Sequence, residues 1–96
     1  MKRLVYLISP NKIYKSFYKD LKKVLEHNNV KFFQLRIKKT SNDNLIRIAK
    51  KIAKITKKYN VKLIINDNAK VAKKIKADGC HLGQSDESII EVNKYF

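Results

Sequence analysis

The sequence predicts an α/β protein with a parallel sheet, and two observations carry this prediction. Short apolar runs, typical of buried strands, alternate with longer segments in which apolar residues recur at helical spacing. The alternation repeats at intervals of roughly 25 residues, whereas antiparallel hairpins would not need helices between their strands. No linker or low-complexity segment interrupts residues 1–96, so we interpret them as a single domain.

The first strand and helix occupy the N-terminal third of the chain. The apolar run Leu4–Ile8 stops at Ser9 and Pro10, which predicts a short buried strand. The segment that follows, up to about Asn29, has the pattern of an amphipathic helix. Its apolar positions are Tyr14, Phe17, Tyr18, Leu21, Val24 and Leu25.

The second unit has the same form. Val30–Lys38 is predicted to be a strand, and Ser41 or Asn42 is a suitable N-cap for a helix that ends near Asn60. The apolar stripe of this helix consists of Leu45, Ile48, Ala49, Ile52, Ile55 and Tyr59.

The remaining units are shorter. Val61–Ile65 is predicted to be a third strand and Gly79–Leu82 a fourth, with a short helix between them that carries Ala69, Ala72 and Ile75. A helix is expected to begin at Ser85 and run toward Phe96, because acids in its first turn suit the helix dipole. Those acids are Asp86 and Glu87.

Two architectures fit this order of elements: an open doubly wound sheet, or a stretch of (β/α) barrel. The first is disfavoured because no G-x-G-x-x-G follows the first strand, and the only glycines are Gly79 and Gly83. A complete barrel typically needs about 250 residues, and roughly 200 at the low end.

The formal charge of +15 suggests nucleic acid as a partner, but the type of basic residue argues against it. Only three of the 23 basic residues are arginines, whereas bidentate recognition of phosphates and guanines favours arginine. A coding bias toward Lys, Asn and Ile explains the charge sufficiently, and the lysines are spread over every predicted helix. We therefore expect a solvated lysine-rich surface and not a nucleic-acid-binding module.

Two features bear on localisation. No apolar run approaches the roughly 18 residues of a membrane span, so we expect no membrane partner. The single cysteine cannot form an internal disulfide, which fits a cytoplasmic protein.

A polar row follows the second predicted strand. Side chains alternate along a strand, so Gln34, Arg36 and Lys38 share one face. One interpretation is an edge strand with its polar face in water. The other is that an amide, a guanidinium and an ammonium converge at a barrel mouth, where they would bind an anion such as diphosphate.

Two carboxylates stand near the C-terminal ends of the next strands, where parallel α/β folds place their sites. Asp67 follows the third strand directly and Asp86 follows the fourth. Neighbouring strands lie about 4.8 Å apart, so both could hold one Mg²⁺ ion, which binds through one or two carboxylates and substrate phosphates. Taken singly, Asp67 also fits a turn and Asp86 a helix start.

The string Gly79-Cys80-His81-Leu82-Gly83-Gln84 is the most unusual in the chain. Gly83 just after a strand suggests a close approach to a ligand or a positive φ. His81 has no partner at the spacing of a zinc site or a catalytic triad. Cys80 points away from His81 and is expected to be a buried thiol.

Four motifs, in this order and spacing, resemble those of the thiamine phosphate synthase family. They are Tyr6-Leu7-Ile8-Ser9-Pro10, Gln34-Leu35-Arg36-Ile37-Lys38, Ile65-Asn66-Asp67, and Gly79-Cys80-His81-Leu82-Gly83-Gln84-Ser85-Asp86. The last, of the form G-x-H-L-G-Q-x-D, carries most of the weight. The family departs from this chain after the Asn-Asp pair, where it commonly has a basic residue and this chain has Asn68.

The resemblance implies the first four β/α units of a (β/α)8 TIM barrel, so that residues 1–96 would be a partial domain. It implies a transferase of thiamine biosynthesis that joins hydroxymethylpyrimidine diphosphate to thiazole phosphate and releases pyrophosphate. The bond from the pyrimidine methylene to oxygen would break first, and the thiazole nitrogen would capture the carbocation. The alternative is a thiazole tautomerase or a noncatalytic relative.

By motif match, the resemblance also implies the roles of individual residues. Arg36 and Lys38 would act in catalysis, and Asp67 and Asp86 would ligate Mg²⁺. The substrate-binding residues would be Gln34, Arg36, Lys38, Asn66, His81 and Gln84. Because the second half of the family's site has no counterpart in these residues, we expect a truncated or split enzyme, self-association, or a partner chain that supplies the other half-barrel.

Overall fold

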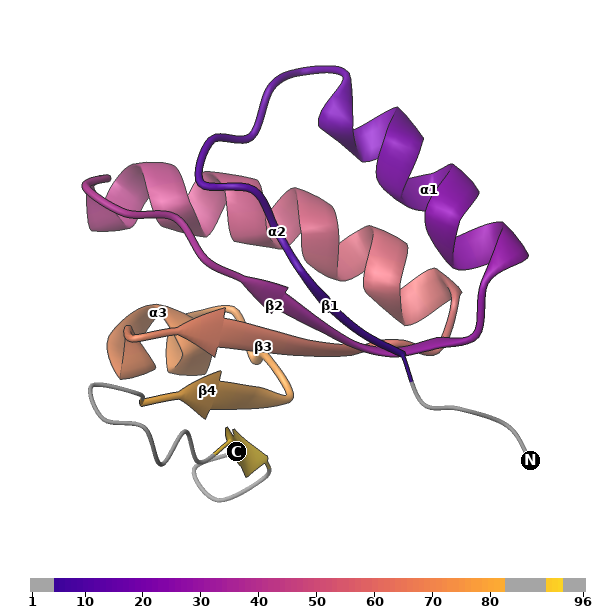
Figure 1. The fold of residues 1–96 in the computed structure, drawn as a ribbon. Helices are drawn as coiled ribbons and strands as arrows, with labels where there is room; N and C mark the ends of the chain where they lie inside the picture. The colour runs from indigo at the N-terminus through magenta and orange to yellow at the C-terminus, as the bar shows by residue number, and fades with distance from the viewer. Residues whose placement is uncertain (1–4, 83–89, 93–96) are drawn as a thin grey trace.

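A five-stranded sheet forms the centre of the computed structural model, which describes residues 5–82 and 90–92 (Figure 1). The strands are β1 (Val5–Ile8), β2 (Val30–Leu35), β3 (Lys62–Asn66), β4 (Gly79–His81) and β5 (Ile90–Val92). Their order in the sheet is the order in the chain, and the first four run parallel. This sequential order is typical of a barrel, because a doubly wound sheet reverses its strand order at the switch point. The predicted α/β fold with a parallel sheet is confirmed.

Three helices connect the parallel strands: α1 (Phe17–His27), α2 (Asn42–Lys58) and α3 (Ala69–Lys74). In Figure 1, α1 and α2 lie side by side along one face of the sheet. All three helices contribute to one apolar core together with the strand residues Phe33, Leu35, Leu63, Ile65 and Cys80. The helices therefore cover the same face, and the opposite face carries the other half of each strand's side chains.

The apolar stripe predicted for the second helix is confirmed. Leu45, Ile48, Ala49, Ile52 and Ile55 are buried in the core, and Tyr59 is half-buried at the C-cap. The predicted cap is also present, because the Ser41 side chain accepts a hydrogen bond from the Asn44 amide at 3.1 Å. A 17-residue helix with this pattern can bury its stripe along the whole sheet.

The first helix is shorter than expected. It begins at Phe17, and Tyr14, predicted as part of its apolar stripe, is 68% exposed. Val24 is also exposed, whereas Leu21 and Leu25 are buried. The core thus takes four of the six predicted positions, because Phe17 and Tyr18 are partly buried and also pack against it.

The second strand ends at Leu35, three residues before the predicted end at Lys38. Its neighbour β1 ends at Ile8, and its pairing with β3 ends at Leu35 opposite Ile65. The interpretation of this strand as an edge strand is wrong, because β2 lies between β1 and β3 and Gln34 is only 4% exposed.

The helix expected from Ser85 onward is contradicted at Ile90–Val92. These residues form β5, which pairs antiparallel with β4. The alternation Ile-Glu-Val, with two β-branched residues, suits a strand, and pairing with β4 satisfies backbone groups that a helix would leave open on that strand. The favourable interaction of two acids with a helix dipole is smaller than the gain from these backbone hydrogen bonds.

Candidate functional site

The face of the sheet opposite α1, α2 and α3 carries polar side chains in its C-terminal half. Gln34 pairs in register with Ile8 and Ile64, and Asn66 pairs with His81. Each of these strands ends at the same edge, because the four strands are parallel. The sheet therefore brings Gln34, Asn66 and His81 together on one face, because side chains alternate along each strand.

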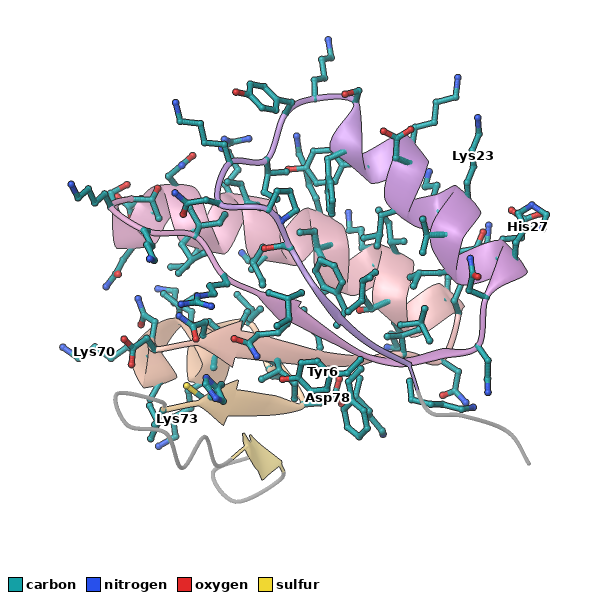
Figure 2. The ribbon with its side chains drawn as sticks, viewed as in Figure 1. Tyr6, Lys23, His27, Lys70, Lys73 and Asp78 are labelled. Atoms are coloured by element: carbon teal, nitrogen blue, oxygen red, sulfur yellow. The ribbon has the colours of Figure 1, made fainter. Side chains whose placement is uncertain are left out.

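Tyr6 completes this face on β1. Figure 2 shows Tyr6 on the side of the sheet away from α1 and α2. Its ring stacks on Phe32 at a centroid distance of 5.8 Å, and its hydroxyl accepts a hydrogen bond from Gln34 Nε2 at 2.6 Å. Burial raises the pKa of Tyr6, and the hydrogen bond from Gln34 offsets part of that rise. The Tyr6 hydroxyl thus satisfies a donor of the buried Gln34 amide, and the amide oxygen of Gln34 can accept a hydrogen bond from another group.

Beyond the strands, the loop after β1 contacts the loop after β2. The Ser9 amide donates to the Gln34 carbonyl at 2.9 Å, which continues the parallel ladder by one bond. The next bond uses a side chain, because the Arg36 amide donates to Ser9 Oγ at 2.9 Å. The Ser9 hydroxyl lies 3.1 Å from the Pro10 carbonyl, to which it can donate its own proton.

A second side chain continues this arrangement two residues later. The Lys38 amide donates to Asn11 Oδ1 at 2.8 Å. Ile37, between the two cations, is partly buried and packs against the core, whereas Arg36 and Lys38 are exposed. Arg36 and Lys38 therefore lie outside the strand and are exposed, whereas Gln34, predicted to share their face, is buried within it.

These residues line a cleft at the C-terminal edge of the sheet. It has a volume of about 310 Å³ and is lined by Ile8, Ser9, Asn11, Arg36 and Lys38. Two cations and no carboxylate stand among these described lining residues. A small open cleft with this lining can bind a phosphate-type anion through a bidentate guanidinium and an ammonium.

On the other side of the same edge, β3 and β4 bring three further groups together. His81 Nδ1 lies 3.1 Å from Asn66 Oδ1, so a proton on Nδ1 is directed to the amide oxygen. The Asp67 amide donates to the His81 carbonyl at 2.7 Å. Asp67 has a φ of 59°, a left-handed conformation that aspartate adopts more readily than most residues, and its carboxylate is exposed.

Asn68 and Cys80 fix the segment behind Asp67. Asn68 caps α3 by accepting a hydrogen bond from the Val71 amide at 3.0 Å, and its Nδ2 donates to Asn42 Oδ1 at 2.8 Å. Cys80 is fully buried on the helix side, as predicted. Burial raises the pKa of the Cys80 thiol, a hydrogen bond with the Asn68 backbone lowers it, and the charge of Asp67 raises it further.

Two predicted site residues, Gln84 and Asp86, lie outside the residues that the structure describes. Within residues 5–82 and 90–92, no three His, Cys, Asp or Glu side chains gather closely enough to hold a metal ion. In the same part of the chain, no helix is long and apolar enough to cross a membrane.

Residues 5–96 match the thiamine monophosphate synthase family. The chain belongs to this family. A thiamine-phosphate synthase from Pelagibacter ubique is 54% identical over 94 residues, which cover 97% of this chain and 45% of that protein. One from Clostridioides difficile is 40% identical over 92 residues, covering 94% of this chain and 43% of the relative.

A solved structure is similar as well. The thiamine phosphate pyrophosphorylase from Pyrococcus furiosus has a TM-score of 0.73 and 27% identity, with 88% of this chain and 40% of that chain covered. The chain thus spans somewhat less than half the length of these relatives. Its four parallel strands correspond to part of a larger fold of the same family.

Sequence reasoning missed three residues of the site: Tyr6, Ser9 and Asn11. Ser9 directly follows the first strand, so the rule that sites lie at C-terminal strand ends could have found it. Asn11 lies two residues further on, and its contact with Lys38 joins positions 27 residues apart. Such a contact has no local signal in the sequence.

Proposed function

We propose that this chain supplies the diphosphate-binding part of a thiamine phosphate synthase, as one partial domain spanning residues 1–96. The observation that carries the proposal is the cleft with Arg36 and Lys38, which opens at the same sheet edge as Asn66 and His81. The reaction joins hydroxymethylpyrimidine diphosphate to thiazole phosphate. Because the relatives are about twice as long, we assign the complete reaction to the whole barrel and anion binding to this chain.

The reaction requires neutralisation of the negative charge on the diphosphate leaving group. When the bond from the pyrimidine methylene to oxygen breaks, the electron pair leaves with the diphosphate, and the thiazole nitrogen lone pair then bonds to the carbocation. Arg36 and Lys38 would stabilise the departing diphosphate, since preorganised cations are most effective where negative charge develops. Gln34, Asn66, His81 and Gln84 would bind and orient the pyrimidine diphosphate.

The two acids of the predicted site, Asp67 and Asp86, are suitable ligands for Mg²⁺. The exposed carboxylate of Asp67 stands at the strand ends, and Asp86 follows β4 in sequence. A hard cation that binds through one or two carboxylates and leaves positions for phosphate oxygens fits this donor set. The ion would supply Lewis-acid stabilisation of the diphosphate, and these two residues would hold it.

We place the protein in the cytoplasm, consistent with its single buried thiol. The residues that complete the barrel would come from further chain, from a second copy, or from a partner chain. Sedimentation with and without magnesium diphosphate distinguishes a monomer from a self-associated form.

The test is calorimetric binding of magnesium diphosphate to the wild-type chain and to Arg36→Ala. We expect Arg36→Ala to lower the affinity at least tenfold, because hydrogen bonds to charged groups contribute about 1.5–3 kcal/mol. Lys23→Ala is the matched control: it also removes one cation, and Lys23 projects from α1 away from the sheet (Figure 2). Equal losses in the two variants, or no binding by the wild type, would contradict the proposal. Chelation of magnesium should weaken diphosphate binding as well.

A further inference from the structure

Two side chains of the loop after β1 hold the backbone of the loop after β2. Ser9 Oγ and Asn11 Oδ1 accept the amides of Arg36 and Lys38, at 2.9 and 2.8 Å. Alternate residues of one loop are thus joined to alternate residues of the other. We call these two side-chain-to-backbone contacts the loop clasp.

The loop clasp joins the two segments beyond the end of the sheet. The last backbone bond between these chains runs from the Ser9 amide to the Gln34 carbonyl. The amides of residues 36 and 38 donate to side chains of the clasp and no longer to a neighbouring strand. Between the two cations, Ile37 packs against the core and gives the same segment a second anchor.

This anchoring has a direct effect on anion binding. Arg36 and Lys38 have long, exposed side chains, and binding one anion requires that both the loop backbone and these side chains become ordered. A backbone already held at the right spacing removes part of the ordering cost, because only the side chains remain to be fixed. Ser9 itself is 8% exposed, so its hydroxyl is a well-ordered acceptor.

We propose that Ser9 and Asn11 are positioning residues that hold Arg36 and Lys38 at the spacing at which the two cations bind one diphosphate. This inference rests on the proposed function, and it adds two residues to the site. Ser9 and Asn11 act through the backbone of the cationic loop, and their own removal takes away no positive charge.

The primary variant is Asn11→Ala, because Asn11 is exposed and its truncation leaves the core intact. Two measurements are made on the 96-residue chain: amide hydrogen exchange by NMR, and calorimetric binding of magnesium diphosphate. We expect faster exchange at the Lys38 amide and an affinity about three- to tenfold weaker, which corresponds to the loss of one hydrogen bond. Asn28→Ala is the matched control, since Asn28 donates to the Val24 carbonyl at the end of α1.

A double-mutant cycle separates positioning from a general structural effect. If Asn11 acts through Lys38, Asn11→Ala should weaken binding in the wild type and have no further effect in Lys38→Ala. At the other contact, Ser9→Ala should weaken binding, and Ser9→Thr, which keeps the hydroxyl, should restore it. Additive losses in the cycle, or an equal loss in Ser9→Thr and Ser9→Ala, would overturn the positioning role.

The outcomes also separate this inference from the proposed function. Wild-type binding that Asn11→Ala leaves unchanged, or an unchanged exchange rate at the Lys38 amide, would overturn the loop clasp alone. Absence of diphosphate binding by the wild type would overturn the proposed function and the positioning role together.

Discussion

Gln34 shows how this sheet accommodates a polar side chain inside the molecule. It is 4% exposed, and its amide donates to the Tyr6 hydroxyl at 2.6 Å. An unpartnered donor there would cost about 1–3 kcal/mol, so the tyrosine on the neighbouring strand is needed to keep the amide buried. The alternation of residues predicted on which face Gln34 lies, but its partner became visible only with the register of β1 on β2.

At the same scale, Cys80 makes stability depend on pH. Its thiol pKa is raised above the ordinary 9.0, chiefly by burial. Above that pH the unfolded chain loses the thiol proton while the folded chain keeps it, so the free energy of unfolding falls as pH rises. We expect this contribution to reach at most about 1.4 kcal/mol per pH unit, and to be absent in Cys80→Ala.

Urea unfolding between pH 8 and 10 measures this effect. The comparison is between the slopes of stability against pH in the two proteins, because Cys80→Ala also lowers the stability itself by leaving a small cavity. Parallel slopes would show that the thiol does not contribute.

At the scale of elements, the capping of α2 provides a prediction with an internal control. Ser41 Oγ accepts the Asn44 amide, whereas Ser16, at the N-cap of α1, makes no side-chain cap bond. Ser41→Ala should therefore lower the free energy of unfolding by about 1 kcal/mol, and Ser16→Ala should leave it nearly unchanged. Chemical denaturation of both variants checks this, and similar losses in the two would refute it.

The sequence predicted the elements best where the pattern is long. The apolar stripe of α2 repeats over several turns, and its predicted positions from residue 45 to residue 55 are all buried in the core. Short segments were predicted less well: β2 ends at Leu35, where its pairing with β3 also ends, and Ile90–Val92 pairs with β4 instead of forming a helix. In both cases the neighbouring strand decided the outcome, since a strand's hydrogen bonds lie outside its own segment.

At the scale of the whole molecule, the charge of +15 should make stability depend on salt. Lysines on α1 and α3, such as Lys23, Lys70 and Lys73, are exposed (Figure 2), so their mutual repulsion acts through solvent. Raising the ionic strength from 0.01 to 0.15 M shortens the screening length from about 30 to about 8 Å. A gain of about 1 kcal/mol would raise Tm by about 4–8 °C in a domain of this size.

Thermal unfolding followed by circular dichroism at several salt concentrations tests this. Sodium chloride and sodium fluoride should give the same rise in Tm, because screening depends on ionic strength and not on the identity of the anion. A Tm that stays constant or falls in both salts would contradict self-repulsion as a term in the stability.

The sequence by itself determined the α/β class with a parallel sheet, the buried stripe of α2 and the family, because these depend on periodicity and on motifs within single segments. It also placed Asp67 and Asp86 near the C-terminal ends of strands, and the resemblance to the family added Asn66 and His81 to the candidate site. The tertiary structure decided where β2 stops, which residue supports Gln34, and how the cationic loop is held. Those features depend on contacts between residues 27 or 28 positions apart, and the pairing register of the strands sets them.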